Sequence, residues 1–267
     1  MQIPSTRPAA RGAQSFSRNF LSDVVIDYGP RDVLNRLFLK ADTELREQGV
    51  ELSFVPVEMM VEVNRLNRES WLALFPIVDA RLGAFNDQNG FCIVGRNASG
   101  EVVTAQAVRL YEFGRGSFKE EAESLRLWYS NPERMKAAGE ACRVTCPSAA
   151  ALQGRAVFSG GVWYHPDYRR LGLTTIIGRV VKAYAYTRWF PDTTFTLMLE
   201  SVLAGGTGRR AGYTHSELAV DVDNLPGLGS IRLALLWLSA EEHGAYFSDY
   251  LAARDAQIDT VVLNRTA

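Results

Sequence analysis

The sequence predicts a mixed α/β fold, a class that some conventions call α+β. Residues 155–164 form a β-rich run that stops at a proline-containing turn. A glycine-containing loop then leads into 176–184, whose apolar positions recur at helical spacing. Two more β-rich runs, 91–96 and 101–111, flank a turn that ends at Gly100, which is the pattern of a hairpin. Strands and helices therefore alternate along the chain, as in a sheet covered by helices.

The composition is that of one large globular domain. The chain has 267 residues, 47% hydrophobic and 22% charged, so it can bury a sizeable core. Its formal net charge of -1 provides no basic field, which argues against nucleic acid as a partner. No apolar run approaches the roughly 20 residues of a membrane span, which argues against a membrane partner.

The first 22 residues differ from the rest of the chain. They contain Arg7, Arg11 and Arg18, several Ser, Pro and Ala residues, and no acidic residue. This composition is typical of a disordered tail; it faintly resembles an organelle transit peptide and lacks the apolar segment of a secretory signal. We therefore expect a flexible tail at 1–22, a single folded domain at 23–267, and a cytoplasmic location.

The three cysteines do not indicate a metal site. Three residues separate Cys142 from Cys146, which is neither a zinc-ribbon nor a redox Cys-x-x-Cys spacing, and no histidine lies near them in sequence. With Cys92, they are expected to be reduced cytosolic thiols, and no metal is expected.

Ahead of the hairpin, the pattern predicts three helices and one strand. Apolar residues at helical spacing predict a helix over 32–48, which ends at Gly49. Residues 51–55 alternate briefly and predict a strand, while 57–66 and 70–82 predict two more helices.

After the hairpin, the segment 114–153 interrupts the regular pattern. It contains a charged, helical stretch over 118–138 that Pro132 breaks, and residues 141–153 show no clean period.

The C-terminal third predicts three strands and two helices. Strands are expected at 193–200 and 215–222, with a short glycine-rich helix up to Gly212 between them. A long helix is expected over 231–256, followed by a last strand over 259–263.

The loop after the 155–164 run is suited to an anion. The first amides of a helix lack internal partners and lie at the positive end of the helix dipole, so such a loop binds phosphate well. Its sequence over 164–174, Tyr-His-Pro-Asp-Tyr-Arg-Arg-Leu-Gly-Leu-Thr, resembles the acetyl-coenzyme A loop of the GNAT superfamily of N-acetyltransferases, Arg/Gln-x-x-Gly-x-Gly/Ala. Arg169, Gly172 and Thr174 fall on the three fixed places, although Thr174 replaces the Gly or Ala of the family.

A second stretch downstream carries the same resemblance. The family has Asn-x-x-Ala after the next strand, then a Tyr four residues on and Gly-Phe four residues after that. Here Ser201, Ala204 and Gly212-Tyr213 keep this spacing, but Gly208 stands at the Tyr place. In the family that Tyr commonly protonates the leaving thiolate, so its absence leaves the general acid open.

The resemblance implies a fold and a cosubstrate. The fold is a GNAT-like, mixed and mostly antiparallel sheet of about seven strands flanked by helices, with its core over 51–263. Three pieces are additions to that core: an N-terminal extra helix at 32–48, an inserted segment at 114–153 and the long helix at 231–256. The cosubstrate is acetyl-coenzyme A.

The resemblance also implies the site residues. The pantetheine arm and the acyl carbonyl are expected to pair with the backbone of Val162, Trp163 and Tyr164, and Gly160-Gly161 suits a distorted strand there. The phosphates are expected on the loop and the helix start, at Arg169, Arg170, Leu171, Gly172, Leu173, Thr174 and Thr175.

The catalytic residues are less defined by the sequence. Ser201 is the first candidate for the general acid, because its place faces the thiol in the family, with Thr207 and Tyr213 as alternatives. Glu200 is the first candidate for the general base, and Glu112 and His165 are the others considered.

These observations predict an acyl-coenzyme A-dependent N-acyltransferase. The expected reaction is acetyl transfer to a primary amine of a small molecule or a protein, by direct attack in a ternary complex. Dimers are common in the family, so a homodimer is compatible with this hypothesis. Two alternatives stay open: a non-catalytic coenzyme A-binding or scaffold protein, and an NAD(P)-dependent reductase using the glycine run Gly206–Gly212, which the few residues before the next strand argue against.

Overall fold

The protein folds around one twisted eight-stranded sheet. The computed structural model describes residues 20–265, and side chains for residues 20–252. The strand order is β1-β2-β3-β5-β6-β8-β7-β4, and every neighbouring pair is antiparallel except β5 and β6. The strands are β1 (Glu51–Val55), β2 (Gly90–Arg96), β3 (Val102–Glu112), β4 (Ala141–Val144), β5 (Arg155–Tyr164), β6 (Thr193–Leu199), β7 (His215–Leu225) and β8 (Gly229–Ser239).

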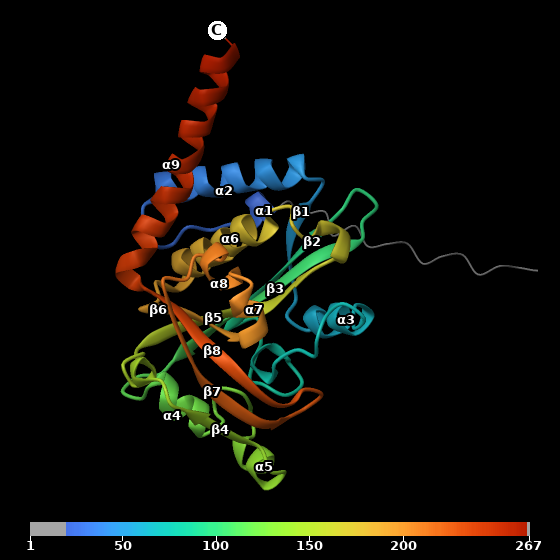
Figure 1. The fold of residues 1–267 in the computed structure, drawn as a ribbon, viewed down its shortest axis with the longest axis vertical. Helices are drawn as coiled ribbons and strands as arrows, with labels where there is room; N and C mark the ends of the chain where they lie inside the picture. The colour runs from blue at the N-terminus through green and yellow to red at the C-terminus, as the bar shows by residue number, and fades with distance from the viewer. Residues whose placement is uncertain (1–19, 266–267) are drawn as a thin grey trace, which may run out of the picture.

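Helices cover both faces of the sheet (Figure 1). Helices α2, α6 and α9 pack on one face and bury a core with Phe91 and Val157; α3, the segment after it and α4 cover the other face around Phe158 and Phe195. The α-helices are α1 (Phe20–Asp23), α2 (Arg31–Glu47), α3 (Met59–Leu66), α4 (Phe118–Glu123), α5 (Pro132–Ala137), α6 (Leu173–Trp189), α7 (Glu200–Ala204), α8 (Thr207–Arg210) and α9 (Ala240–Arg265). Three short 3-10 turns span Pro76–Val78, Pro147–Ala150 and Pro166–Tyr168.

The mixed, mostly antiparallel sheet flanked by helices confirms the predicted fold class, with eight strands in place of about seven. The predicted hairpin is present as β2 and β3. Its turn forms because the Asn97 Oδ1 accepts from the amides of Ser99 and Glu101, both at 3.0 Å, while Gly100 takes a left-handed φ of +81°.

The predicted helix over 70–82 is wrong. This segment is irregular apart from the 3-10 turn Pro76–Val78, and Phe75 is extended with ψ 143°. Pro76 causes this, because a proline disfavours the helical conformation of the residue before it and has no amide hydrogen to donate. The irregular backbone lets Trp71 lie flat on Trp163, with ring centroids 5.5 Å apart.

The inserted segment contains the eighth strand, which the sequence pattern did not indicate. β4 has four residues and pairs with the outer edge of β7, Cys142 opposite Val222. A strand this short shows too few alternations to be recognised by period. The charged stretch before it forms two separate helices, α4 and α5.

The predicted long helix over 231–256 and last strand over 259–263 are both wrong. Residues 229–239 form β8, which lies between β6 and β7, and α9 begins at Ala240 and runs through 259–263. β8 is a central strand with a continuous buried run from Leu233 to Leu236, so it lacks the alternation that distinguishes a strand from a buried helix.

The sequence contained one signal for this boundary. Ser239-Ala-Glu-Glu242 has the Ser-x-x-Glu spacing of a helix start, and the Glu242 carboxylate accepts from the Ser239 amide at 2.8 Å.

The predicted tail at 1–22 lies mostly outside the described residues. Its last three residues belong to α1, where the Phe20 side chain is fully buried against Phe38 and Phe54. Among the described residues, none of the helices combines the length and the apolar character that crossing a membrane requires.

Candidate active site

A slot opens between β5 and β6 at the centre of the sheet. The two strands pair only where Ala156–Phe158 lies beside Thr193–Phe195. Beyond that point both continue without pairing to each other, β5 to Tyr164 and β6 to Leu199. The main-chain groups of β5 that face β6 are left without a strand partner there.

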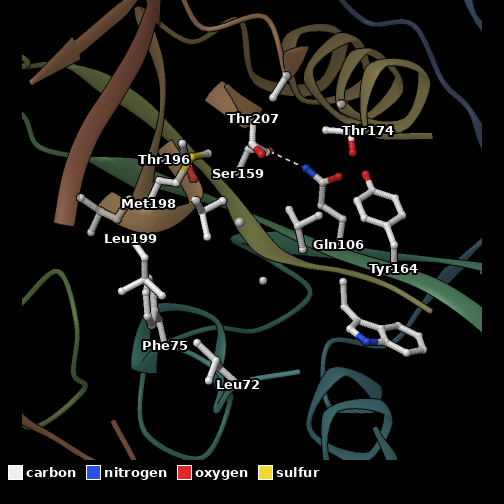
Figure 2. Close-up of a pocket in the computed structure, with 18 of the residues that line it drawn as sticks. Leu72, Phe75, Gln106, Ser159, Tyr164, Thr174, Thr196, Met198, Leu199 and Thr207 are labelled. Carbon is white, nitrogen blue, oxygen red and sulfur yellow. Dashed lines mark hydrogen bonds between the residues drawn. The ribbon is translucent and has the colours of Figure 1, made fainter. Parts of the chain in front are cut away.

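A pocket of about 530 Å³ fills this slot and reaches both faces of the sheet. On one face its wall is α6 and α8, represented by Thr174 and Thr207 in Figure 2. On the other face its wall is the segment 70–75, represented by Leu72 and Phe75. A ligand on one face can thus meet a ligand on the other inside the slot.

A bulge in β5 shapes the slot. Gly160 pairs with Ala107 and Trp163 with Ala105, so β5 has one residue more than β3 over this stretch. Gly161 supplies the bulge with a left-handed φ of +58°, and an added Cβ would lie 3.1 Å from a Val78 methyl group. The predicted distortion at Gly160-Gly161 is present, and it turns the following residues toward the pocket.

The loop after β5 presents amides at the start of α6. Arg170 and Gly172 both have left-handed backbones, with φ of +72° and +77°, and Gly172 is the N-cap residue, so no side chain caps the helix. Left-handed residues in such loops are typical of concave sites where several amides face one anion. Nothing lies within 4 Å of a Cβ placed on Gly172, so the space beside the Cα of this cap residue is open.

Of the predicted cofactor residues, five line the pocket and five do not. Those that line it are Val162, Trp163, Tyr164, Arg169 and Thr174. Gly172 and Leu173 form the cap and first helical position, Thr175 bonds to the Arg210 carbonyl at 3.4 Å, and Arg170 and Leu171 are exposed on the loop.

The Arg169 side chain connects the end of β5 to the 70–75 wall of the pocket. Its guanidinium donates to the Tyr164 carbonyl at 3.1 Å and to the Ser70 carbonyl at 2.9 Å. The first acceptor belongs to β5 and the second to the 70–75 segment, so this residue has a structural task beside any role toward a phosphate.

Polar groups gather deep in the slot, where the two strands separate. Gln106 Nε2 donates to the Ser159 hydroxyl at 2.9 Å, while Gln106 Oε1 is buried without a hydrogen-bond partner (Figure 2). The buried Tyr164 hydroxyl, which lies beside Thr174, is also unpartnered. Unpaired buried polar atoms are costly, so this part of the slot is built to meet polar atoms of a ligand or of water.

Lys182 is the only lysine among the described residues that line the pocket, and it is 1% exposed. Its Nζ donates to the Ala211 carbonyl at 2.7 Å and the Gly178 carbonyl at 3.5 Å, and lies 4.2 Å from the centre of the Tyr213 ring. None of the described acidic side chains forms an ion pair with it. Burial, assisted by the positive charge of Arg179, lowers the Lys182 pKa to about 7.

Tyr213 is a second pocket residue, beside Tyr164, whose phenol can donate a proton. It extends toward the Ser159 and Thr196 hydroxyls, which lower its pKa, but burial has the larger effect and raises that pKa above its ordinary value. The phenol is therefore protonated at neutral pH and can donate a hydrogen bond in the slot.

The two predicted catalytic residues lie outside the pocket lining. Glu200 and Ser201 are exposed at the start of α7. At the place where the family has its Tyr, Gly208 is buried against β8, and an added Cβ would lie 2.3 Å from a Leu236 methyl group. A larger side chain at position 208 therefore needs Leu236 to move.

Three parts of the site were missed by the sequence analysis: Gln106, Lys182 and the 70–75 wall. Lys182 left a weak signal, because it is the one charged residue between Arg179 and Arg188 on an otherwise apolar helix. The glycine run Gly206–Gly212 contains only the four-residue α8, too short for the helix of a dinucleotide site.

Comparisons with known proteins give distant likenesses in fold. The sequence matches no protein-family model, and a search of curated proteins returned no match. Among solved structures, a mutant spermidine N-acetyltransferase from Vibrio cholerae is 9% identical with a TM-score of 0.42, covering 73% of this chain and 96% of its own. A ribosomal-protein-S5-alanine acetyltransferase from Vibrio fischeri is 8% identical with a TM-score of 0.42, covering 73% and 94%. Likeness at this level decides neither an activity nor a substrate.

Proposed function

We propose that the protein is an acyl-coenzyme A-dependent N-acyltransferase that transfers an acetyl group to a primary amine. The observation that carries the proposal is the slot between β5 and β6, which opens beside the uncapped start of α6. An extended thioester arm fits between separated strands, and its phosphates fit at helix amides. The family membership suggested by the 164–174 loop is part of the same proposal.

The residues present fit acetyl-coenzyme A. The amides of Leu173 and Thr174 lie in the first turn of α6, which no side chain caps, so they can donate to a pyrophosphate, and Arg170 adds positive charge on the same loop. The backbone of Val162, Trp163 and Tyr164 would hold the pantetheine arm along the unpaired edge of β5. The bound cosubstrate supplies the activated acyl group, and the slot holds it against the amine.

We assign proton transfer in this reaction to Lys182. An amine loses a proton when it becomes an amide, and the described part of the pocket lining offers no carboxylate that could accept it. As the C–N bond forms, neutral Lys182 Nζ can accept that proton. When the C–S bond of the thioester breaks, the resulting ammonium can give the proton to the departing coenzyme A thiolate; a pKa of about 7 suits both steps at neutral pH. Glu200 and Ser201 stay predictions of the sequence, with the alternative acid Tyr213 better placed inside the pocket.

Two other functions remain to be separated from this one. A non-catalytic coenzyme A-binding protein is favoured by Gly208, whose contact with Leu236 leaves no room for the usual acid. An NAD(P)-dependent reductase has the weaker support of the Gly206–Gly212 run. A cytoplasmic location and a homodimer also stay predictions.

A thermal-shift comparison of acetyl-coenzyme A, free coenzyme A and NADPH tests the proposal. We expect both coenzyme A compounds to raise the melting temperature and NADPH to leave it unchanged. A shift with NADPH alone would support the reductase, and no shift with acetyl-coenzyme A at high concentration would end the proposal. A shift by acetyl-coenzyme A, with no thiol released in the presence of any amine, would support the non-catalytic alternative.

A further inference from the structure

Among the residues whose side chains the structure describes, no carboxylate lines the pocket. Of the residues that line it, only Arg169 and Lys182 carry an ionisable charge at neutral pH, and both are basic. The carboxylates next to the lining in sequence, Glu69 and Glu200, are exposed and do not belong to it. A second positive charge on a bound amine would therefore find no counter-ion inside the slot.

The wall opposite α6 is aromatic and held in place. Trp71 lies flat on Trp163, with an interplanar angle of 14°, and Trp163 Nε1 donates to the Ser70 hydroxyl at 3.0 Å. Arg169 also donates to the Ser70 carbonyl, so both the side chain and the main chain of Ser70 are held in place beside Trp71. The wall is thus a preformed apolar surface rather than a loose loop.

Exposed apolar side chains also line the pocket. Leu72 is 57% exposed, Val162 41% and Val202 41%, and all three belong to the lining. Isolated exposed apolar residues are ordinary, but three that line one pocket with Phe75 and Leu199 mark a binding surface for an apolar group.

We infer that the acceptor is a monoamine with an apolar, aromatic or aliphatic body, and that diamines and polyamines are poor acceptors. This inference rests on the proposed function, since it assigns the substrate class of the same slot. The body of the amine lies against Trp71, Leu72 and Phe75, and its amino group reaches the polar end of the slot.

Two acceptors that differ by one group test the inference. Hexylamine and 1,6-diaminohexane have the same chain, but the second carries an additional ammonium. With acetyl-coenzyme A as donor, we expect kcat/KM for thiol release to be about a hundredfold higher for hexylamine, because the second charge stays unpaired. We expect 2-phenylethylamine to be at least as good as hexylamine, since its ring can lie on the aromatic wall.

The converse experiment adds a carboxylate to the 70–75 wall and asks whether diamines become better acceptors. Leu72→Glu adds the missing carboxylate at the mouth, and should raise the ratio of diamine to monoamine kcat/KM by about tenfold or more. The matched control is Leu66→Glu, which makes the same change at a leucine that is 66% exposed on α3 and outside the pocket, and should leave the ratio unchanged.

The outcomes separate this inference from the proposed function. Equal or faster turnover of 1,6-diaminohexane by the unaltered protein would overturn the inference, as would an unchanged ratio in the Leu72→Glu variant. No thiol release with any of the three amines, in a protein that acetyl-coenzyme A stabilises, would also overturn it and leave coenzyme A binding intact. No stabilisation by acetyl-coenzyme A would mean that the proposed function itself has failed.

Discussion

The two walls of the slot are built in different ways. The part of the α6 wall that faces the loop is short-range structure: one bulged strand, one loop with left-handed residues and one helix start, all within Gly160–Thr175. The opposite wall is long-range structure: the irregular segment 70–75 is held by Trp163 and Arg169, which lie about ninety or more residues further along the chain. The first wall offers mainly backbone amides, and the second offers side-chain surface.

This difference explains why the α6 wall could be predicted from the sequence and the 70–75 wall could not. A loop that binds through its backbone needs particular residues at fixed spacing, such as Gly172, because the φ angles must be right. An apolar wall needs only the correct shape and polarity, which many sequences provide. We therefore expect substitutions on the α6 wall to affect the cosubstrate and those on the opposite wall to affect the acceptor.

The largest expected effect comes from Gly172→Glu. The new side chain places a carboxylate in the open space before the α6 amides, where it would repel a pyrophosphate. We expect stabilisation by acetyl-coenzyme A to be lost in a thermal-shift titration. Gly100→Glu is the matched control, because Gly100 also has a left-handed φ and nothing within 4 Å, but lies in the β2–β3 turn. Retained stabilisation in the Gly172 variant would place the pyrophosphate elsewhere.

Lys182→Met is expected to reduce kcat by about a hundredfold or more, as for loss of a general acid–base group. Acetyl-coenzyme A should still stabilise the variant, because Met is apolar and of similar length. In the unaltered protein, turnover of hexylamine should rise with pH through about 7 as Lys182 becomes neutral. The residual turnover of Lys182→Met should not show this rise with pH. Lys136→Met, on the exposed surface of α5, is the matched control and should keep the kcat and the pH profile of the unaltered protein. A pH profile in Lys182→Met that equals that of the unaltered protein would show that Lys182 does not transfer the proton.

The same residue links pH to stability. The folded-state pKa of Lys182 is lowered from 10.5 to about 7, so between these values the unfolded chain binds a proton that the folded protein does not. Its contribution to the free energy of unfolding therefore increases as the pH rises from 7 toward 10. Urea unfolding of the unaltered protein and Lys182→Met at pH 7 and pH 9 measures this contribution. A stability difference between the two proteins that is the same at both pH values would contradict the lowered pKa.

Trp71→Ala tests the opposite wall. Removing the ring exposes Trp163 and takes away the surface for the acceptor, so KM for hexylamine should rise by about tenfold, while the Kd for acetyl-coenzyme A should stay within about twofold. The loss of buried area will also lower the free energy of unfolding by about 3 kcal/mol. Trp71→Phe, which keeps an aromatic face, should recover most of the KM. If the Kd for acetyl-coenzyme A changed more than the KM for hexylamine, the two walls would not bind different substrates.

Arg169→Gln should have the smallest effect and should affect both walls. It removes the bonds to the Tyr164 and Ser70 carbonyls, so we expect rises of about threefold in both the Kd for acetyl-coenzyme A and the KM for hexylamine. Arg170→Gln removes an exposed charge from the same loop and should affect the Kd alone. Steady-state kinetics and calorimetry of the two variants distinguish these results. A change confined to the Kd in Arg169→Gln would show that the bond to Ser70 does not organise the acceptor wall.

Much of the fold was predictable because its signals are local. The bounds of β1 and β5 agree with the predicted 51–55 and 155–164, and the hairpin and the start of α6 follow from turn residues and periodicity. The errors fall where local patterns are ambiguous. The buried Leu-rich run of β8 resembles a helix until β6 and β7 pair with its two edges, and Trp71 lies on a wall instead of a helix because Pro76 breaks the pattern.

The sequence by itself determined the strand–loop–helix unit around Gly172, because an uncapped helix start and left-handed backbones require particular residues in order. Tertiary structure alone decided that Gln106, Lys182 and the 70–75 wall meet at one slot, since these residues are brought together by the separation of β5 and β6. It also decided the state of Lys182: an amine on a helix has an ordinary pKa in water, and burial, assisted by the positive charge of Arg179, lowers the Lys182 pKa to about 7.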